Sequence, residues 1–174
     1  MSLIFLIAVF GLIASIVAHT ATFCGVNPQK VFPPIWGLHV LIFVIWVPVV
    51  FMLAKRFPKG THARLKDMAP KAPAWMRGVC GVFFAYALFN LVFTMLILSE
   101  GKHVGIVDGK KVLRGKISRV LSDDEYERYQ AYEVRGFSGH WLFFYAMGTT
   151  VLYSRLKEDA EKESGVFPPT THPC

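Results

Sequence analysis

Three histidines are the residues of this chain whose type and position could do chemistry. His19 lies near the end of the first long apolar segment, and His39 and His140 lie near the starts of the second and the fourth. Neutral imidazole is a good ligand for haem iron, copper or zinc, and such ligands in helical bundles come from facing helices. The three are therefore the candidate cofactor-binding residues. His103, a few residues beyond the third segment, is an additional candidate metal ligand.

Two interpretations of the histidines stay open. In one, a pair binds haem b, all three hold a transition metal, or a single histidine binds the magnesium of a pigment. In the other, which the shallow positions favour, each histidine hydrogen-bonds a neighbouring helix, a headgroup or water. Each helix has one histidine, so there is no second layer for a two-haem bundle. We expect at most two to share a ligand, with His19 and His39 the favoured pair.

Four apolar segments must position these side chains. They cover residues 3–23, 33–54, 75–98 and 137–153, with charged connectors between them. About 20 helical residues at roughly 1.5 Å each cross the hydrocarbon layer, so all four are predicted transmembrane helices. The first lacks a basic leading region and is too long for a signal peptide, so we expect it to remain as a span. The predicted fold is an all-α antiparallel four-helix membrane bundle, with residues 1–174 forming one integral membrane domain.

A small extracytoplasmic cap is predicted between the third and fourth helices, over residues 100–136. Asp108 and Gly109 are flanked by β-prone residues, which is the pattern of a tight hairpin. Ser122 and Glu125 have the spacing of a capping box at a helix start. The cap is thus predicted to be a hairpin followed by a helix.

That helix is expected to be short and amphipathic, because Tyr126, Tyr129 and Tyr132 recur at a spacing of three. It would lead into the fourth apolar segment, with bends at Gly136 and Gly139. The end of the chain, from about residue 164 to 174, is predicted to be disordered.

The basic connector between the second and third segments predicts the orientation. Its only acidic residue is Asp67. Its basic residues, counted to the edge of the third segment, are Lys55, Arg56, Lys59, Arg64, Lys66, Lys71 and Arg77. Basic residues hold a short loop on the cytoplasmic side. Both termini are therefore predicted to be cytoplasmic, in a bacterial inner membrane, and the histidines lie towards the outer surface.

Composition excludes several classes of function. The net charge of +7 could suggest a nucleic-acid partner, but many of the basic residues lie between apolar segments, where lipid headgroups and orientation account for them. The sequence has no phosphate-binding glycine loop, GxSxG elbow or HExxH pair, and its three cysteines lack metal-type spacing. No catalytic residue is predicted.

The function predicted from these observations is that of a non-enzymatic accessory or structural subunit of a larger membrane assembly. The outer segment is rich in tyrosine and mixed charges, which is typical of protein interfaces. Its expected partners are the lipid bilayer and other membrane proteins, and no nucleic acid. The alternative is a haem b- or metal-binding electron-transfer protein that uses the histidine layer.

Overall fold

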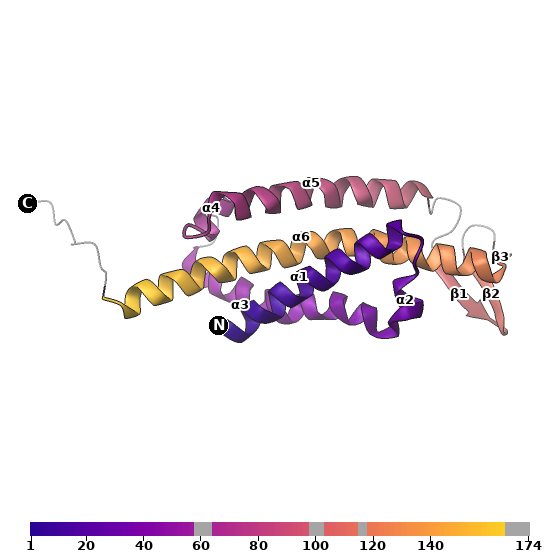
Figure 1. The fold of residues 1–174 in the computed structure, drawn as a ribbon, viewed down its shortest axis with the longest axis horizontal. Coiled ribbons are helices and arrows are strands. Elements are labelled where there is room, and N and C mark those ends of the chain that lie inside the picture. Colours follow the sequence, from indigo (N-terminus) through magenta and orange to yellow (C-terminus); the bar gives the residue numbers. More distant parts are fainter. Residues whose placement is uncertain (58–63, 98–102, 115–117, 166–174) are drawn as a thin grey trace, which may run out of the picture.

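The computed structural model describes residues 1–57, 64–97, 103–114 and 118–165 and is mostly helical (Figure 1). Its elements are α1 (Ser2–Phe23), α2 (Pro28–Val31), the 3-10 helix η1 (Pro33–Trp36), α3 (Gly37–Arg56), α4 (Leu65–Met68), α5 (Ala74–Ile97), β1 (His103–Val107), β2 (Lys110–Arg114), β3 (Arg119–Val120) and α6 (Asp123–Glu163). Residues 166–174, most of the tail that was predicted to be disordered, lie outside this description.

Among the residues that the structure describes, three helical stretches are long and apolar enough to cross a membrane. They are α1, the continuous stretch from η1 through α3, and α5. These coincide with the first three predicted transmembrane segments. The chain runs back and forth along one axis, so α1 and α5 point towards the sheet while α3 and α6 point away from it (Figure 1).

α6 differs from the predicted fourth helix. It is a single helix of 41 residues, about 60 Å at roughly 1.5 Å per residue, and it joins the tyrosine-rich stretch to the fourth apolar segment. The expectation of a separate short helix before that segment was therefore wrong. Gly136 and Gly139 lie inside continuous helix, where their lack of a side chain serves packing.

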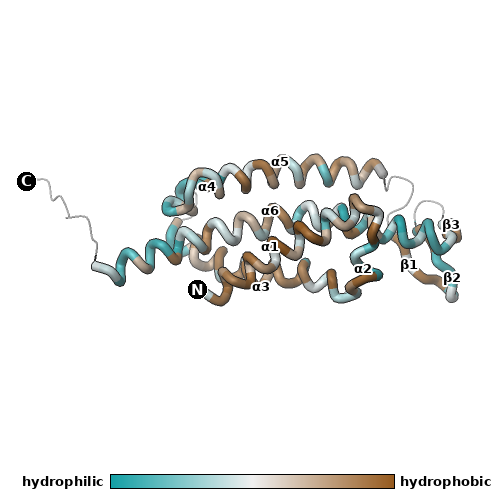
Figure 2. The backbone as a smooth tube through the Cα atoms, viewed as in Figure 1, coloured by the Kyte–Doolittle hydropathy of each residue, from teal (hydrophilic) through white to brown (hydrophobic). Residues whose placement is uncertain are grey.

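α6 is also the central helix of the bundle. α5 lies along one side of it, and α1 and α3 lie on the other (Figure 1). In Figure 2, α6 is paler than α1 and α3, so it is less hydrophobic than they are, and both of its ends are hydrophilic. Trp141, Tyr145 and Leu152 of α6 are at most 1% exposed, whereas Leu3 and Phe10 of α1 are 70% and 65% exposed. The outer helices carry the apolar surface, and the central helix carries aromatic, small and polar side chains that fit between them.

The three strands form an antiparallel sheet in the order β1-β2-β3, at the end of the molecule where α6 begins. Asp108 and Gly109 connect β1 to β2 and both have positive φ, 48° and 73°, as a tight two-residue hairpin turn requires. Leu113 is 2% exposed on the face towards α6, and the backbone N–H of Val104 donates to Glu133 Oε1 of α6 at 3.1 Å. The hairpin is thus attached to the start of the central helix.

A capping box starts α6. Ser122 Oγ accepts a hydrogen bond from the Glu125 backbone N–H at 3.3 Å, and Glu125 Oε2 accepts one from the Ser122 backbone N–H at 3.0 Å. The bond from Ser122, together with Arg119, lowers the pKa of Glu125. A hydrogen bond from Lys111 of β2 to Asp123 Oδ1, at 2.8 Å, likewise lowers the pKa of Asp123. Charged carboxylates therefore stabilise the first turn of α6 and its contact with the sheet.

Candidate functional site

A chain of hydrogen bonds around His19 links three helices in the bundle interior. His19 on α1 is 6% exposed. Its Nδ1 lies 2.7 Å from Ser138 Oγ on α6, and its Nε2 lies 2.5 Å from the Tyr86 hydroxyl on α5. His19, near the end of α1, thus contacts both α5 and α6 through its two ring nitrogens.

The direction of these bonds follows from Ser138. Its hydroxyl donates to the Arg135 carbonyl at 3.2 Å, so its oxygen accepts the proton on Nδ1 of His19. His19 Nε2 then accepts from the Tyr86 hydroxyl. Both nitrogens are occupied in a neutral imidazole, which leaves neither free to bind a metal.

The neighbouring contacts between α5 and α6 are equally close. Asn90 of α5 is 1% exposed, and its Nδ2 donates to the backbone carbonyls of Arg135 and Gly136, both at 3.0 Å. Asn90 therefore joins α5 to α6 through its side-chain amide. A Cβ on Gly139 would overlap the Asn90 carboxamide, so the absence of a side chain there allows the amide to reach the backbone of α6.

Arg135 brings a permanent charge to this region. Its guanidinium carbon lies 3.8 Å from the centre of the Phe23 ring and 5.1 Å from that of Phe93. Its charge acts on both His19 and Tyr86, and its Nε is buried without a hydrogen-bond partner among the described residues.

His39 occupies a different environment. Its Nδ1 accepts a hydrogen bond from the Trp141 indole N–H at 3.1 Å, and its ring contacts Phe43 and Phe137 edge to face. Because indole only donates, Nδ1 is unprotonated and the proton of the neutral ring lies on Nε2. His39 therefore contributes to an aromatic contact between α3 and α6.

His140 bonds within its own helix. Its Nδ1 lies 3.0 Å from the carbonyl oxygen of Gly136, one turn earlier in α6. A carbonyl accepts, so Nδ1 carries a proton, and in a neutral ring Nε2 is then the unprotonated nitrogen. This is the arrangement of a metal-binding histidine, but a single ligand does not make a site.

The three candidate histidines therefore have separate partners. His19 and His39, the favoured pair, share none, and the fourth candidate, His103, is described only by its backbone in β1, paired with Arg114. Within the described ranges, no three His, Cys, Asp or Glu side chains are grouped to hold a metal ion. The structure thus leaves haem or metal binding as a prediction from sequence, without a geometry that favours it.

Two hollows in the molecule also bear on cofactor binding. One, of about 440 Å³, lies beside Arg135 near the sheet, and its charged lining residues are Asp124, Glu127, Arg128 and Arg135. The other, of about 860 Å³, lies at the opposite end of the bundle, where α3 ends. Neither hollow is lined by a histidine. The histidines are packing residues rather than walls of these hollows.

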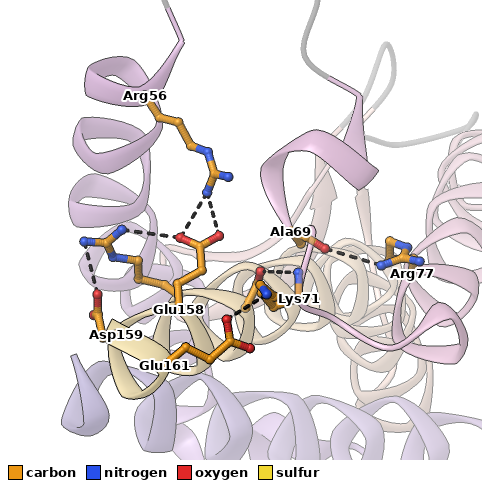
Figure 3. Close-up of polar contacts among 9 residues, drawn as sticks. Arg56, Ala69, Lys71, Arg77, Glu158, Asp159 and Glu161 are labelled. Carbon is orange, nitrogen blue, oxygen red and sulfur yellow. Dashed lines mark hydrogen bonds and ion pairs between the residues drawn. The ribbon is translucent and has the colours of Figure 1, made fainter. Parts of the chain in front are cut away.

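At that opposite end, a network of ion pairs ties α6 to α3 and to the segment before α5 (Figure 3). Arg56 Nη1 lies 2.9 Å from Glu158 Oε1, and Lys71 Nζ lies 2.7 Å from Glu161 Oε2. The Lys71 backbone N–H also donates to Ser154 Oγ at 3.0 Å. The basic residues that predicted a cytoplasmic connector thus also attach it to the central helix.

The important residues that the sequence did not identify are the partners of the histidines. Ser138 carries no local sign of its partner, because that partner is His19, 119 positions earlier. Tyr86 carries no local signal within its apolar segment, and its bond spans 67 positions. One sign of this network is visible in the sequence, because Arg135 is a charged residue directly before the apolar part of α6.

Comparisons with known protein families, with curated proteins and with solved structures find no match to this chain. The chemistry of the site must therefore be judged from its own geometry. A histidine with both nitrogens bonded between three helices positions those helices.

Proposed function

We propose that this chain is a four-span membrane protein that acts as a non-enzymatic subunit bound to a partner membrane protein. Three helices are apolar enough to cross the bilayer, and α6 packs along all three of them. Contacts on α6 extend from Ser138, with α1, to Thr150, whose hydroxyl lies 3.2 Å from Cys80 Sγ of α5. If its neighbours cross the membrane, α6 crosses with them. The apolar part of α6, residues 137–153, is then the fourth span.

The basic connector supports an orientation with both termini in the cytoplasm. Lys55 and Arg56 end α3, and Lys66 and Lys71 follow around α4, at the end of the bundle that also holds the start of α1 and the end of α6 (Figure 1). The sheet and the first turns of α6 then lie on the outer side. Within a bacterial inner membrane this places the sheet in the periplasm.

The observation that carries the subunit proposal is a group of three valines on one face of the sheet, a face that Lys110 and Arg114 share. Val112 is paired with Gly105 and with Val120, and Val107 lies two residues after Gly105, so the three valines share the face opposite α6. Val120 is 61% exposed and Val107 is 39% exposed. These three residues are called the valine face below.

An apolar face outside the membrane is the kind of surface that a partner covers. Exposed apolar patches on the aqueous side of a protein mark interaction sites, because water penalises them. On the opposite face of the same sheet, Leu113 is buried, whereas Ile106 is 62% exposed. The valine face is therefore available to a second protein without any change in the fold.

Site-specific photocrosslinking in cells that express the native assembly tests this proposal. A photoreactive residue at Lys110, which pairs with Val107 at the edge of the valine face, should give a discrete protein adduct. The same residue at Lys66, on exposed α4, is the matched control and should not give that adduct. Crosslinks from Lys110 to lipid alone would show that the face rests on the membrane and would refute the partner.

The alternative, a haem b- or metal-binding electron-transfer protein using His19, His39 and His140, stays a prediction. Binding through Nε2 would require His39 to lose or move its proton, and His19 to give up the bond from Tyr86. A reduced-minus-oxidised absorption spectrum and metal analysis of the purified chain test it directly.

A further inference from the structure

The hollow where α3 ends has an apolar floor. Most of the floor comes from α3, and one residue each comes from α4 and α6. The apolar lining residues are Val47, Pro48, Phe51, Met52, Met68 and Val151. Val47 and Phe51 are 52% and 67% exposed, so the floor is open on the outer side of α3. That side faces the acyl chains of the bilayer in the four-span arrangement.

The rim of the same hollow is basic. Among the described lining residues, Lys55, Arg56, Arg155 and Lys162 are basic and Glu158 alone is acidic, so four positive charges face one negative charge. Lys55 and Arg56 lie about 10 Å beyond Pro48 along α3, at roughly 1.5 Å per residue. Apolar floor and charged rim therefore follow one another along the axis of the bundle, as tail and headgroup do in a phospholipid.

The rim keeps unpaired charge. Glu158 is shared between Arg56 Nη1, at 2.9 Å, and Arg155 Nη1, at 3.4 Å. Lys55 and Lys162 have no ion-pair partner within the part of the chain that the structure describes. Both lysines are exposed at the mouth of the hollow. An anionic group can reach them without breaking an existing pair.

From this arrangement we propose that the hollow binds one anionic glycerophospholipid. Lys55 and Lys162 contact its phosphate, and an acyl chain lies on the apolar floor beside Pro48. The charge selects anionic over zwitterionic headgroups, and basic pockets between helices on the cytoplasmic side suit such headgroups. The inference rests on the membrane placement of the bundle but not on the existence of a protein partner.

Native mass spectrometry of the purified full chain in detergent tests the proposal. The probes are phosphatidylglycerol and phosphatidylcholine with identical acyl chains. A cation near an anionic lipid surface contributes on the order of fivefold in affinity, so we expect phosphatidylglycerol to bind at least about fivefold better. Equal binding of the two lipids would overturn the proposal.

Variants locate the site. The double substitution Lys55→Gln with Lys162→Gln should remove most of the preference for phosphatidylglycerol. Lys66→Gln with Lys157→Gln removes the same charge from exposed positions that do not line the hollow, and it should keep the preference. Equal loss in the two double variants would show a general effect of charge and would overturn the site.

A variant with a higher affinity for the lipid provides a further test, because misfolding would not raise that affinity. Glu158→Gln removes the acid from the rim and should raise the affinity for phosphatidylglycerol several-fold. A fall in affinity would contradict the proposal.

Glycerol 3-phosphate and inorganic phosphate should not displace the lipid at equal concentration, since neither contacts the apolar floor. Full displacement by either would show a site for free phosphate instead of lipid.

Discussion

At the residue scale, His19 connects more of the bundle than any other histidine described, because its two ring nitrogens join α1 to α5 and α6. Polar side chains between helices in a membrane stabilise by roughly 0.6 kcal/mol on average and up to about 2 kcal/mol. The same bonds fix the rotation of α1 about its axis. His19 is thus a positioning residue for the bundle.

Removal of one bond in this network should have a measurable effect. Tyr86→Phe deletes the hydroxyl that donates to His19 Nε2 and should lower the free energy of unfolding in SDS by about 0.5–1.5 kcal/mol. Tyr153→Phe is the matched control, because Tyr153 makes ring contacts with Phe5 and Lys157 that the substitution keeps. Equal effects of the two substitutions would contradict the network.

The histidines show what sequence could and could not predict at this scale. A polar residue inside an apolar segment is visible in the sequence, so the sequence alone pointed to His19, His39 and His140. Their partners were not, because the helix rotations that select Ser138 for His19 and Trp141 for His39 depend on packing between distant segments. Of the partners expected on a neighbouring helix, His19 has the Ser138 hydroxyl and His39 has the Trp141 indole, whereas His140 bonds a carbonyl of its own helix.

At the scale of the elements, the contact between α5 and α6 depends on glycines of the central helix. A Cβ on Gly136 would lie 2.7 Å from Thr94 Cγ2, and one on Gly139 would overlap Asn90. Gly81 of α5, by contrast, has nothing within 4 Å of the position of a Cβ. The two helices can approach closely only along the glycines of α6.

This difference gives a paired prediction. Gly139→Ala should destabilise the bundle by about 1–3 kcal/mol, because Asn90 must move and lose its bonds to the backbone of α6. Gly81→Ala should leave stability unchanged or raise it slightly, since alanine favours helix and meets open space. Unfolding in SDS measures both. A larger loss for Gly81→Ala than for Gly139→Ala would refute the packing described here.

The start of α6 should respond to pH. The pKa of Glu125 is lowered from its ordinary value of 4.5 by the bond from the Ser122 backbone and by Arg119, so its stabilising effect is present above about that pH. It is lost as the pH falls through the lowered value. Amide hydrogen exchange of the first turns of α6 should therefore increase on acidification below 4.5, after correction for intrinsic rates.

Substitution isolates the carboxylate. In Glu125→Gln the helix start should be less protected at neutral pH, and the part of the acid response that comes from Glu125 should disappear. Asp123, whose pKa Lys111 lowers, keeps a response of its own. An unchanged response in Glu125→Gln would show that Asp123 alone is responsible.

The sequence predicted the outer elements better than the central one. α1, α3 and α5 are apolar around most of their circumference, and length and composition identify such helices. α6 is surrounded by these helices, so it contains Ser138, Thr149 and Thr150 where a lipid-facing helix would have leucine. Its hydropathy is weak because other helices, not lipid, surround it. Its full length of 41 residues could not be predicted, because the composition changes from polar to apolar within the helix.

At the scale of the whole molecule, the orientation can be measured by thiol labelling. In a background with Cys24, Cys80 and Cys174 replaced by serine, Lys110→Cys should react with an impermeant reagent added to intact cells. Lys66→Cys, on α4, should react only after permeabilisation. Both positions are exposed, so accessibility within the protein does not explain a difference. The reverse pattern would invert the topology.

If the valine face holds this chain in an assembly, the mass of the solubilised particle should depend on that face. The native chain is extracted in a mild detergent, and the protein mass of the detergent-solubilised particle is determined alongside that of Val107→Thr with Val120→Thr. Threonine keeps the shape and strand preference of valine but makes the face polar. We expect a complex heavier than 19.6 kDa for the native chain and partial or complete dissociation of the variant, while Val107→Ile with Val120→Ile should keep the complex. Recovery of the native chain only as a free 19.6 kDa monomer would contradict the account.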